Sequence, residues 1–371
     1  MSSNSFAPVY LGVEGLVSKE LKKMDVKEVE SQNGRIIFTG NYKTMARINI
    51  NSRYSERVLI LLSNFKATTF EELFDGVKAI PFERWIDKKD AFPVKGSSIN
   101  SKLFSIPDCQ SIIKKAIVER LKSKYNISWF EKTGSLYQIQ FLIMKDEVSI
   151  MIDTSGQGLH KRGYRANSTI ALIRETLAAS MANLAFVNKN TNLIDPFCGS
   201  GTILIESALY AMNIAPGLNR KFVSESWSGY IKEIFDNERE RAIDLVNRDI
   251  PFEAIGYDID DAALCLAKEN AKKAGVLSKI KVFKRDIRDF KENLEKCTVI
   301  CNPPYGHRLL DIAGAQEIYS LMGKVFYRRD GYNYYIISPD EDFESFLGRK
   351  SDKRRKLYNG MVRCQFYMYF K

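Results

Sequence analysis

The sequence has few histidines and cysteines, the residues from which many metal centres and disulfide scaffolds are built, and it has no long apolar run. Only two histidines occur in 371 residues, and the six cysteines are scattered along the chain. No apolar run approaches the roughly 18 residues of a membrane span, and the first residues lack the pattern of a secretory signal. We therefore expect a cytoplasmic protein with reduced thiols, no metal site and no membrane contact.

Positive charge is what the sequence has in excess. The net charge is +11, and residues 1–165 carry 26 basic and 18 acidic side chains, so this front part holds eight of the eleven net positive charges. A basic surface attracts an anionic partner, of which nucleic acid is the common example. A merely solvated surface is the alternative, but the concentration of charge at the front favours a nucleic-acid-binding module there.

A short apolar strand, residues 297–300, ends at a pair of prolines. Because proline cannot continue the strand, the Asn302 amide and the Pro303 carbonyl become fixed acceptors, and Tyr305 after Pro304 offers a stacking surface. Two acceptors that take the hydrogens of an aromatic amine favour the sp3-like nitrogen that forms as it attacks. The stretch predicts a site for a planar ring with an exocyclic amine. A surface turn is the alternative for these residues alone.

A second motif lies in residues 193–206. A short apolar strand leads into a tight glycine turn, and a helix begins directly after it. Gly199 and Gly201 allow positive φ and a close approach of a ligand to the backbone, while the helix offers free N–H groups. The motif lacks the lysine of a P-loop and the spacing of a dinucleotide fold, so it predicts a nucleotide-like cofactor rather than a cradled phosphate chain. The residues that we expect at this cofactor are Asp195, Pro196, Phe197, Cys198, Gly199, Gly201 and Thr202.

Two further predicted strands end in a carboxylate. Asp258 closes the first of them, where a carboxylate can accept both ribose hydroxyls of a cofactor. Such an acid usually follows the glycine loop by about 20 residues, and here an insertion over residues 208–251 makes the gap longer. Asp286 closes the next strand, and its alternative role is an ion pair with Arg285 or Arg288.

Together, the glycine loop and Asn302-Pro303-Pro304-Tyr305 resemble motifs I and IV of the class I S-adenosylmethionine-dependent methyltransferases that act on amino groups. The resemblance implies S-adenosylmethionine as the cofactor, with Asn302 beside it and Asp286 accepting from its adenine amine. It also implies a Rossmann-like α/β domain over residues 158–371, whose parallel sheet ends in an antiparallel hairpin. Asn359-Gly360, between two strand-like runs, is the expected hairpin turn.

The front part of the chain contains two successive runs of alternating helix and strand patterns. Alternating helix and strand patterns predict an α+β ferredoxin-like unit over residues 1–65, in βαββαβ-like order, and a second such unit over residues 66–157. With the link at residues 158–165, this resembles a ferredoxin-like domain followed by a THUMP RNA-binding domain. The branch that it most resembles is the THUMP-containing guanine N2-methyltransferases, especially those acting on bacterial 23S ribosomal RNA. After the link, residues 170–178 predict an amphipathic helix.

The resemblance implies methyl transfer from S-adenosylmethionine to the N2 amine of a guanine in structured RNA. Candidate RNA contacts are basic residues of the link and of the cluster at residues 349–356, which could equally be a solvated strand edge. These candidates are Lys161, Arg162, Arg165, Arg354 and Arg355. Four alternatives stay open: a transfer RNA guanine N2-methyltransferase, an adenine N6-methyltransferase, a glutamine N5-methyltransferase, and a non-catalytic RNA-binding assembly factor.

Overall fold

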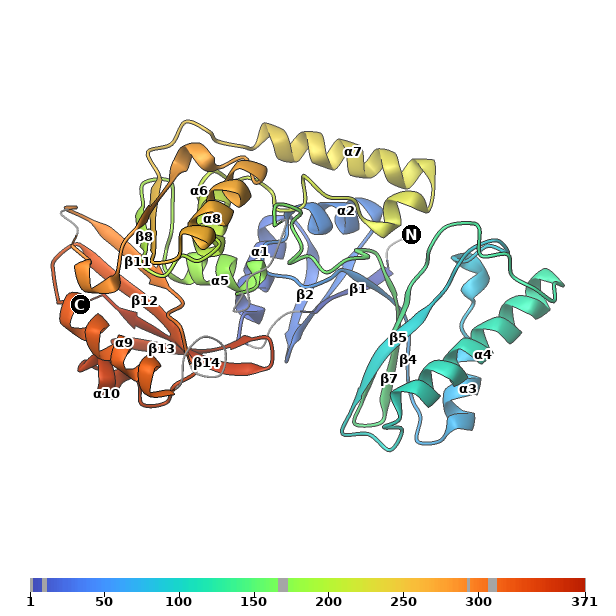
Figure 1. The fold of residues 1–371 in the computed structure, drawn as a ribbon. Coiled ribbons are helices and arrows are strands. Elements are labelled where there is room, and N and C mark those ends of the chain that lie inside the picture. Colours follow the sequence, from blue (N-terminus) through green and yellow to red (C-terminus); the bar gives the residue numbers. More distant parts are fainter. Residues whose placement is uncertain (1–2, 9–11, 166–172, 292–293, 306–311, 371) are drawn as a thin grey trace.

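The computed structural model describes residues 3–8, 12–165, 173–291, 294–305 and 312–370. Two seven-stranded sheets organise these residues, one built by the front part of the chain and one by the back part (Figure 1). None of the helices in these ranges is both long and apolar enough to cross a membrane.

The front sheet joins two α+β units through one shared strand. Its elements are β1 (Ser3–Pro8), α1 (Glu14–Lys23), β2 (Lys27–Gln32), β3 (Arg35–Gly40), α2 (Tyr42–Asn51), β4 (Leu59–Lys66), α3 (Phe70–Lys78), β5 (Val94–Ile99), α4 (Ile106–Tyr125), β6 (Ile139–Met144) and β7 (Glu147–Asp153). The strand order is β2-β3-β1-β4-β7-β6-β5, and β4 pairs with β1 on one side and with β7 on the other. The division that we expected at residue 65 therefore falls within the strand that both units use.

Local sequence explains where helices α2 and α3 begin. The side chain of Asn41 accepts from the Thr44 N–H at 3.0 Å and starts α2. Thr69 and Glu72 form a capping box at the start of α3. Each cap satisfies backbone N–H groups that a helix leaves unpaired at its start, which fixes the position of that start.

The back sheet is parallel up to its last two strands. Its elements are α5 (Glu175–Leu184), β8 (Asn192–Asp195), α6 (Thr202–Ala211), α7 (Gly229–Asp244), β9 (Glu253–Asp258), α8 (Asp261–Lys273), β10 (Ile280–Lys284), β11 (Cys297–Cys301), α9 (Ile312–Val325), β12 (Tyr332–Ser338), α10 (Phe343–Leu347), β13 (Lys353–Asn359) and β14 (Val362–Tyr369). The order is β10-β9-β8-β11-β12-β14-β13, with β13 and β14 antiparallel. The predicted α/β fold, a parallel sheet that ends in an antiparallel hairpin, is confirmed.

The hairpin turn lies one residue later than expected. Asn359 is the last residue of β13 and pairs with Val362, so the two loop residues are Gly360 and Met361. Gly360 has a φ of +66°, whereas Met361 is not among the described residues with positive φ. This is the arrangement of a type II′ turn, in which only the first loop residue needs positive φ. The shift makes Asn359 a strand residue, and its side chain is buried.

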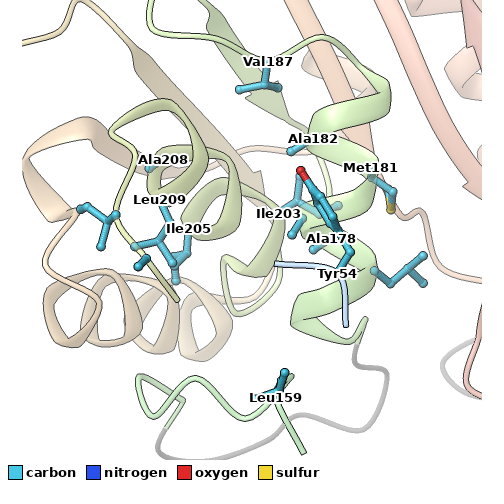
Figure 2. Close-up of a cluster of buried hydrophobic side chains, with 14 of the residues drawn as sticks. Tyr54, Leu159, Ala178, Met181, Ala182, Val187, Ile203, Ile205, Ala208 and Leu209 are labelled. Carbon is cyan, nitrogen blue, oxygen red and sulfur yellow. The ribbon is translucent and has the colours of Figure 1, made fainter. Parts of the chain in front are cut away.

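Helix α5 corrects the expectation of an amphipathic helix over residues 170–178. Residues 170–172 lie outside the described part of the chain, and the helix begins at Glu175. Its residues 175–182 are all buried, so it has no solvent face. One hydrophobic cluster contains α5, α6 and side chains of the ferredoxin-like unit. Figure 2 shows Tyr54 of that unit against the Ala178 and Met181 side of α5. The first unit and the back domain therefore share one core.

The long insertion between α6 and β9 packs against both front units. Figure 1 shows its helix α7 lying along α2, and Arg47 of α2 makes a bidentate ion pair with Glu238 of α7 at 2.9 and 3.1 Å. Trp227, just before α7, stacks on Tyr137 with ring centroids 4.6 Å apart and donates from Nε1 to the Leu136 carbonyl at 3.0 Å. The insertion thus fixes the front units to the back domain.

Candidate active site

The predicted motifs meet at the carboxyl edge of the back sheet. Strand β8 lies between β9 and β11, and all three run parallel. Asp195 ends β8 and pairs with Gly256 of β9, while Val299 of β11 pairs with Ile194. Parallel strands in register end at the same edge, so the chain segments that follow Asp195, Asp258 and Cys301 are neighbours. The strand order changes direction at β8, which is where open α/β sheets bind ligands.

The glycine loop is shaped for close approach. Gly199 and Gly201 have φ values of +51° and +80°, which favour glycine strongly. The space beside the Gly199 Cα is open, with no atom within 4 Å of where a Cβ would lie. Below the loop, the N–H of Cys198 donates to the Tyr257 carbonyl at 2.9 Å. Gly256 is needed there, because a Cβ would lie 2.8 Å from the Cys198 sulfur.

Asp258 ties the loop to the neighbouring strand. Its Oδ2 accepts from the Gly199 N–H at 2.8 Å, and its Oδ1 accepts from the Asp260 N–H at 3.0 Å. A carboxylate has about four acceptor positions, so each oxygen can still accept a ribose hydroxyl. Asp260 caps α8 by accepting from the Ala262 N–H at 2.9 Å.

Asp195 lies beneath the loop and is 1% exposed. Its Oδ1 accepts from the Phe197 N–H at 3.1 Å, which holds the turn through Pro196. Burial raises the pKa of Asp195 to about 8, the Phe197 N–H lowers it, and the charge of Asp258 raises it. Asp195 is therefore mainly protonated at neutral pH. Burial also raises the pKa of the Cys198 thiol, so that thiol stays neutral.

Asn302 presents a buried acceptor without a donor. It follows the last residue of β11, next to the end of β8. Its Oδ1 atom is buried and accepts no hydrogen bond from the described residues. Leaving such a group unpaired costs about 1–3 kcal/mol, and an N–H from a ligand would recover that free energy. Pro303 is buried and Pro304 half-buried, so the strand end is enclosed on the side of the prolines.

The ring of Tyr305 is held from the hairpin. Asn359 Nδ2 donates to the Tyr305 hydroxyl at 2.8 Å. Asn359 is 4% exposed, whereas Tyr305 is half-buried, so a buried amide fixes the tip of a ring that keeps some open surface. The sequence indicated Asn359 only as a turn residue. Nothing in its spacing from Tyr305 predicts the contact, because the two are 54 residues apart.

Asp286 has the ion pair that was the alternative to its cofactor role. Both carboxylate oxygens accept from the Arg288 guanidinium, at 2.9 and 2.8 Å, and Oδ1 also accepts from the Arg288 N–H. The Arg288 side chain lowers the pKa of Asp286 to about 2. Its carboxylate is thus ionised and pre-oriented, two residues after the end of β10 and not on the strand as expected, and it keeps free acceptor positions.

The expected RNA contacts differ in their exposure. Lys161 is exposed, and Arg354 is mostly exposed and lies 3.7 Å from a Glu344 oxygen. Arg355 donates to the Gly12 carbonyl at 2.9 and 2.6 Å. Arg162 is 4% exposed, because its donors face backbone carbonyls of the ferredoxin-like unit, so we withdraw it as an RNA contact.

Arg165 is also largely enclosed. It donates to the Thr202 hydroxyl at 2.7 Å and to the Ile173 carbonyl at 3.3 Å. It therefore lies against the cofactor loop and not on the outer surface, and we withdraw it as an RNA contact too. Among the described residues, no cluster of three histidine, cysteine or acidic side chains could hold a metal ion.

Three family models match successive parts of the chain. The model described as "RMKL-like, methyltransferase domain" matches residues 162–368, the RlmL ferredoxin-like domain matches residues 4–59, and the THUMP domain matches residues 67–153. The open space at Gly199, the remaining acceptor positions of Asp258 and the ionised Asp286 fit S-adenosylmethionine, the cofactor of this family.

Relatives resemble the chain over nearly its full length. YpsC of Bacillus subtilis strain 168 is 41% identical over 97% of this chain and 94% of its own length. Ribosomal RNA large subunit methyltransferase K/L of Shewanella pealeana is 30% identical over 99% of this chain, which spans 52% of that relative. The crystal structure of SMU.472 complexed with SAH superposes with a TM-score of 0.93. The alignment covers 100% of this chain and 98% of the SMU.472 chain, at 37% sequence identity. The chain therefore belongs to the RMKL-like family of S-adenosylmethionine-dependent methyltransferases.

Proposed function

We propose that this protein transfers a methyl group from S-adenosylmethionine to the exocyclic N2 amine of a guanine in structured RNA. The observation that carries the proposal is the buried Asn302 Oδ1 at the strand end beside the cofactor loop, an acceptor to which none of the described residues donates. Of the groups that a substrate can bring, an amine attached to a planar ring supplies the missing N–H.

The residues around Asn302 act by positioning. The Asn302 amide and the Pro303 carbonyl accept the two amine hydrogens, which favours the tetrahedral nitrogen as it attacks. The Tyr305 ring, fixed by Asn359, stacks on the base, a contact worth about 1–3 kcal/mol. When bound, S-adenosylmethionine supplies an electrophilic methyl group on its sulfonium centre. Because an amide takes up a proton poorly, the amine proton leaves to water after transfer. Asn302 Oδ1 is covered in this structure, so the surrounding chain must open to admit the base.

The charge and the domains of the front part support RNA as the molecule that contains the target guanine. Eight of the eleven net positive charges lie in residues 1–165, and the THUMP model matches within that part. A base that reacts inside a closed pocket must leave its stack, so the front units hold the RNA while the guanine swings out. The name of the K/L relatives favours 23S ribosomal RNA over transfer RNA. The chain spans about half the length of those relatives, so only the activity of the matching half bears on this chain.

Comparison of modified nucleosides tests the proposal. Ribosomal and transfer RNA are purified separately from cells with and without the gene, digested, and analysed by mass spectrometry. We expect N2-methylguanosine to be lost from the large ribosomal RNA of the deletion strain and restored by the wild-type gene. Loss from transfer RNA alone would move the substrate to that class. Loss of N6-methyladenosine, or no change in any nucleoside, would contradict the guanine assignment.

A further inference from the structure

The link at residues 158–165 carries a buried arginine that joins the first unit to the cofactor domain. The Arg162 guanidinium donates to the carbonyls of Leu159 and Arg53 at 2.7 and 2.5 Å, and its Nε lies 3.6 Å from Oε1 of Glu206. The Tyr164 hydroxyl donates to the same Glu206 oxygen at 3.0 Å. Glu206 is in α6 and fully buried, so the link is bonded on one side to the ferredoxin-like unit and on the other to α6.

The second arginine of the link holds the start of the same helix. Arg165 donates to the hydroxyl of Thr202, the first residue of α6, at 2.7 Å, and its Nε lies 3.5 Å from Glu175 of α5. Thr202 and Glu206 are four residues apart, so they lie on one face of α6. The residue before Thr202 is Gly201 of the cofactor loop. The link therefore fixes the first two turns of the helix whose N-terminus follows that loop.

This junction contains most of the unpaired buried polar atoms of the described residues. In the described part of the chain, seven buried side-chain nitrogen or oxygen atoms lack a hydrogen-bond partner. Five of them belong to the junction: Arg53 Nη1, Arg162 Nε, Arg165 Nε, Glu206 Oε2 and Ser207 Oγ. Buried charges that are only partly satisfied are costly, and apolar residues of similar volume often give a more stable protein. The network therefore adds little to the stability of the protein, and we attribute its presence to the position that it fixes for α6.

We propose that Arg165 is a positioning residue for methyl transfer, which acts through Thr202 to hold the first turn of α6 and the loop at Gly199–Gly201 in the geometry that binds the cofactor. Arg162 fixes the same helix to the ferredoxin-like unit through the Arg53 carbonyl and Glu206. The inference depends on S-adenosylmethionine as the cofactor and not on which base is methylated.

Calorimetric titration with S-adenosylhomocysteine tests the proposal on the full-length protein. Thr202→Val removes the acceptor of the Arg165 bond and keeps the side-chain shape, and Arg165→Lys keeps the charge but shortens the reach of the donor. We expect each to weaken S-adenosylhomocysteine binding about tenfold, a loss of about 1.4 kcal/mol, while RNA affinity stays unchanged. Thr202→Ser keeps the hydroxyl and should bind within twofold of wild type.

The double variant Arg165→Lys/Thr202→Val separates positioning from direct contact. If the two residues act through one bond, the double variant loses no more affinity than either single variant. Additive losses would show that Thr202 meets the cofactor by itself and would overturn the proposal, as would wild-type affinity in Thr202→Val. Ser207→Ala is the matched control, because it removes a buried hydroxyl of α6 that makes no hydrogen bond with any residue that the structure describes. Equal weakening by this control would also overturn the proposal, since any disturbance of α6 would then suffice.

Discussion

The buried carboxyl under the cofactor loop makes stability depend on pH in an unusual direction. The pKa of Asp195 is raised to about 8 in the folded protein, first by burial and further by the nearby Asp258, from an ordinary value of 3.8. Between these values the folded state holds a proton that the unfolded state releases. Stability therefore falls as pH rises, by about 1.4 kcal/mol per pH unit. From pH 5 to pH 7 the loss is about 3 kcal/mol.

Asp195→Asn removes this ionisable group and keeps the acceptor for the Phe197 N–H. We predict that the free energy of unfolding of the variant minus that of wild type rises by about 3 kcal/mol between pH 5 and pH 7. Urea titrations followed by tryptophan fluorescence at pH 5, 6, 7 and 8 measure it. Asp286→Asn is the control, because the pKa of Asp286 is lowered to about 2 and its carboxylate stays ionised over this range. A pH-independent difference for Asp195→Asn would refute the reasoning.

Three further variants test contacts around the site. Asn359→Ala removes the hydrogen bond to the Tyr305 hydroxyl, and kcat should fall about tenfold without loss of cofactor affinity, as measured by steady-state methyl transfer and calorimetry. Arg47→Met leaves the buried Glu238 without its bidentate partner and should lower the free energy of unfolding by about 3 kcal/mol, whereas Arg47→Met with Glu238→Leu should recover most of it in urea titrations. Gly256→Ala places a methyl group 2.6 Å from Cδ1 of Leu204 in α6, and should weaken S-adenosylhomocysteine binding at least tenfold in a calorimetric titration.

Most of the fold could be read from the sequence because its local signals agree with its packing. The helix pattern of residues 42–51 is one element of the predicted ferredoxin-like unit, and it forms α2 with those bounds, since the Asn41 cap and the apolar spacing point to the same start. Strand β2 gave no such signal. Its residues are polar except for Val29 and mostly exposed, and its pairing with β3 is irregular between Lys27 and Glu30. Periodicity also fails for α5, because a helix buried on all sides has no polar face to mark its limits.

The site was predictable where one segment carries the chemistry, and not where distant segments meet. The glycine loop and Asn302 can be recognised from residue type alone, and the strands before them end at one edge of the sheet. Arg162 lies in a segment whose composition is that of a solvated basic loop. Its partners Arg53 and Glu206 are 109 and 44 residues away in the sequence. Only the docking of the first unit against α6 brings these groups together, and no local pattern encodes that contact.

The role of Asn302 is tested most directly by single-turnover methyl transfer to large ribosomal RNA with Asn302→Ala. The same preparation is assayed for RNA affinity, so that loss of chemistry is separated from loss of binding. If the amide takes a hydrogen of the attacking amine, the transfer rate falls by about 10²–10³-fold, as for removal of a single transition-state hydrogen bond. The RNA dissociation constant should stay within about threefold of wild type, a change of less than 1 kcal/mol. Transfer at the wild-type rate by Asn302→Ala would contradict the assignment of this residue.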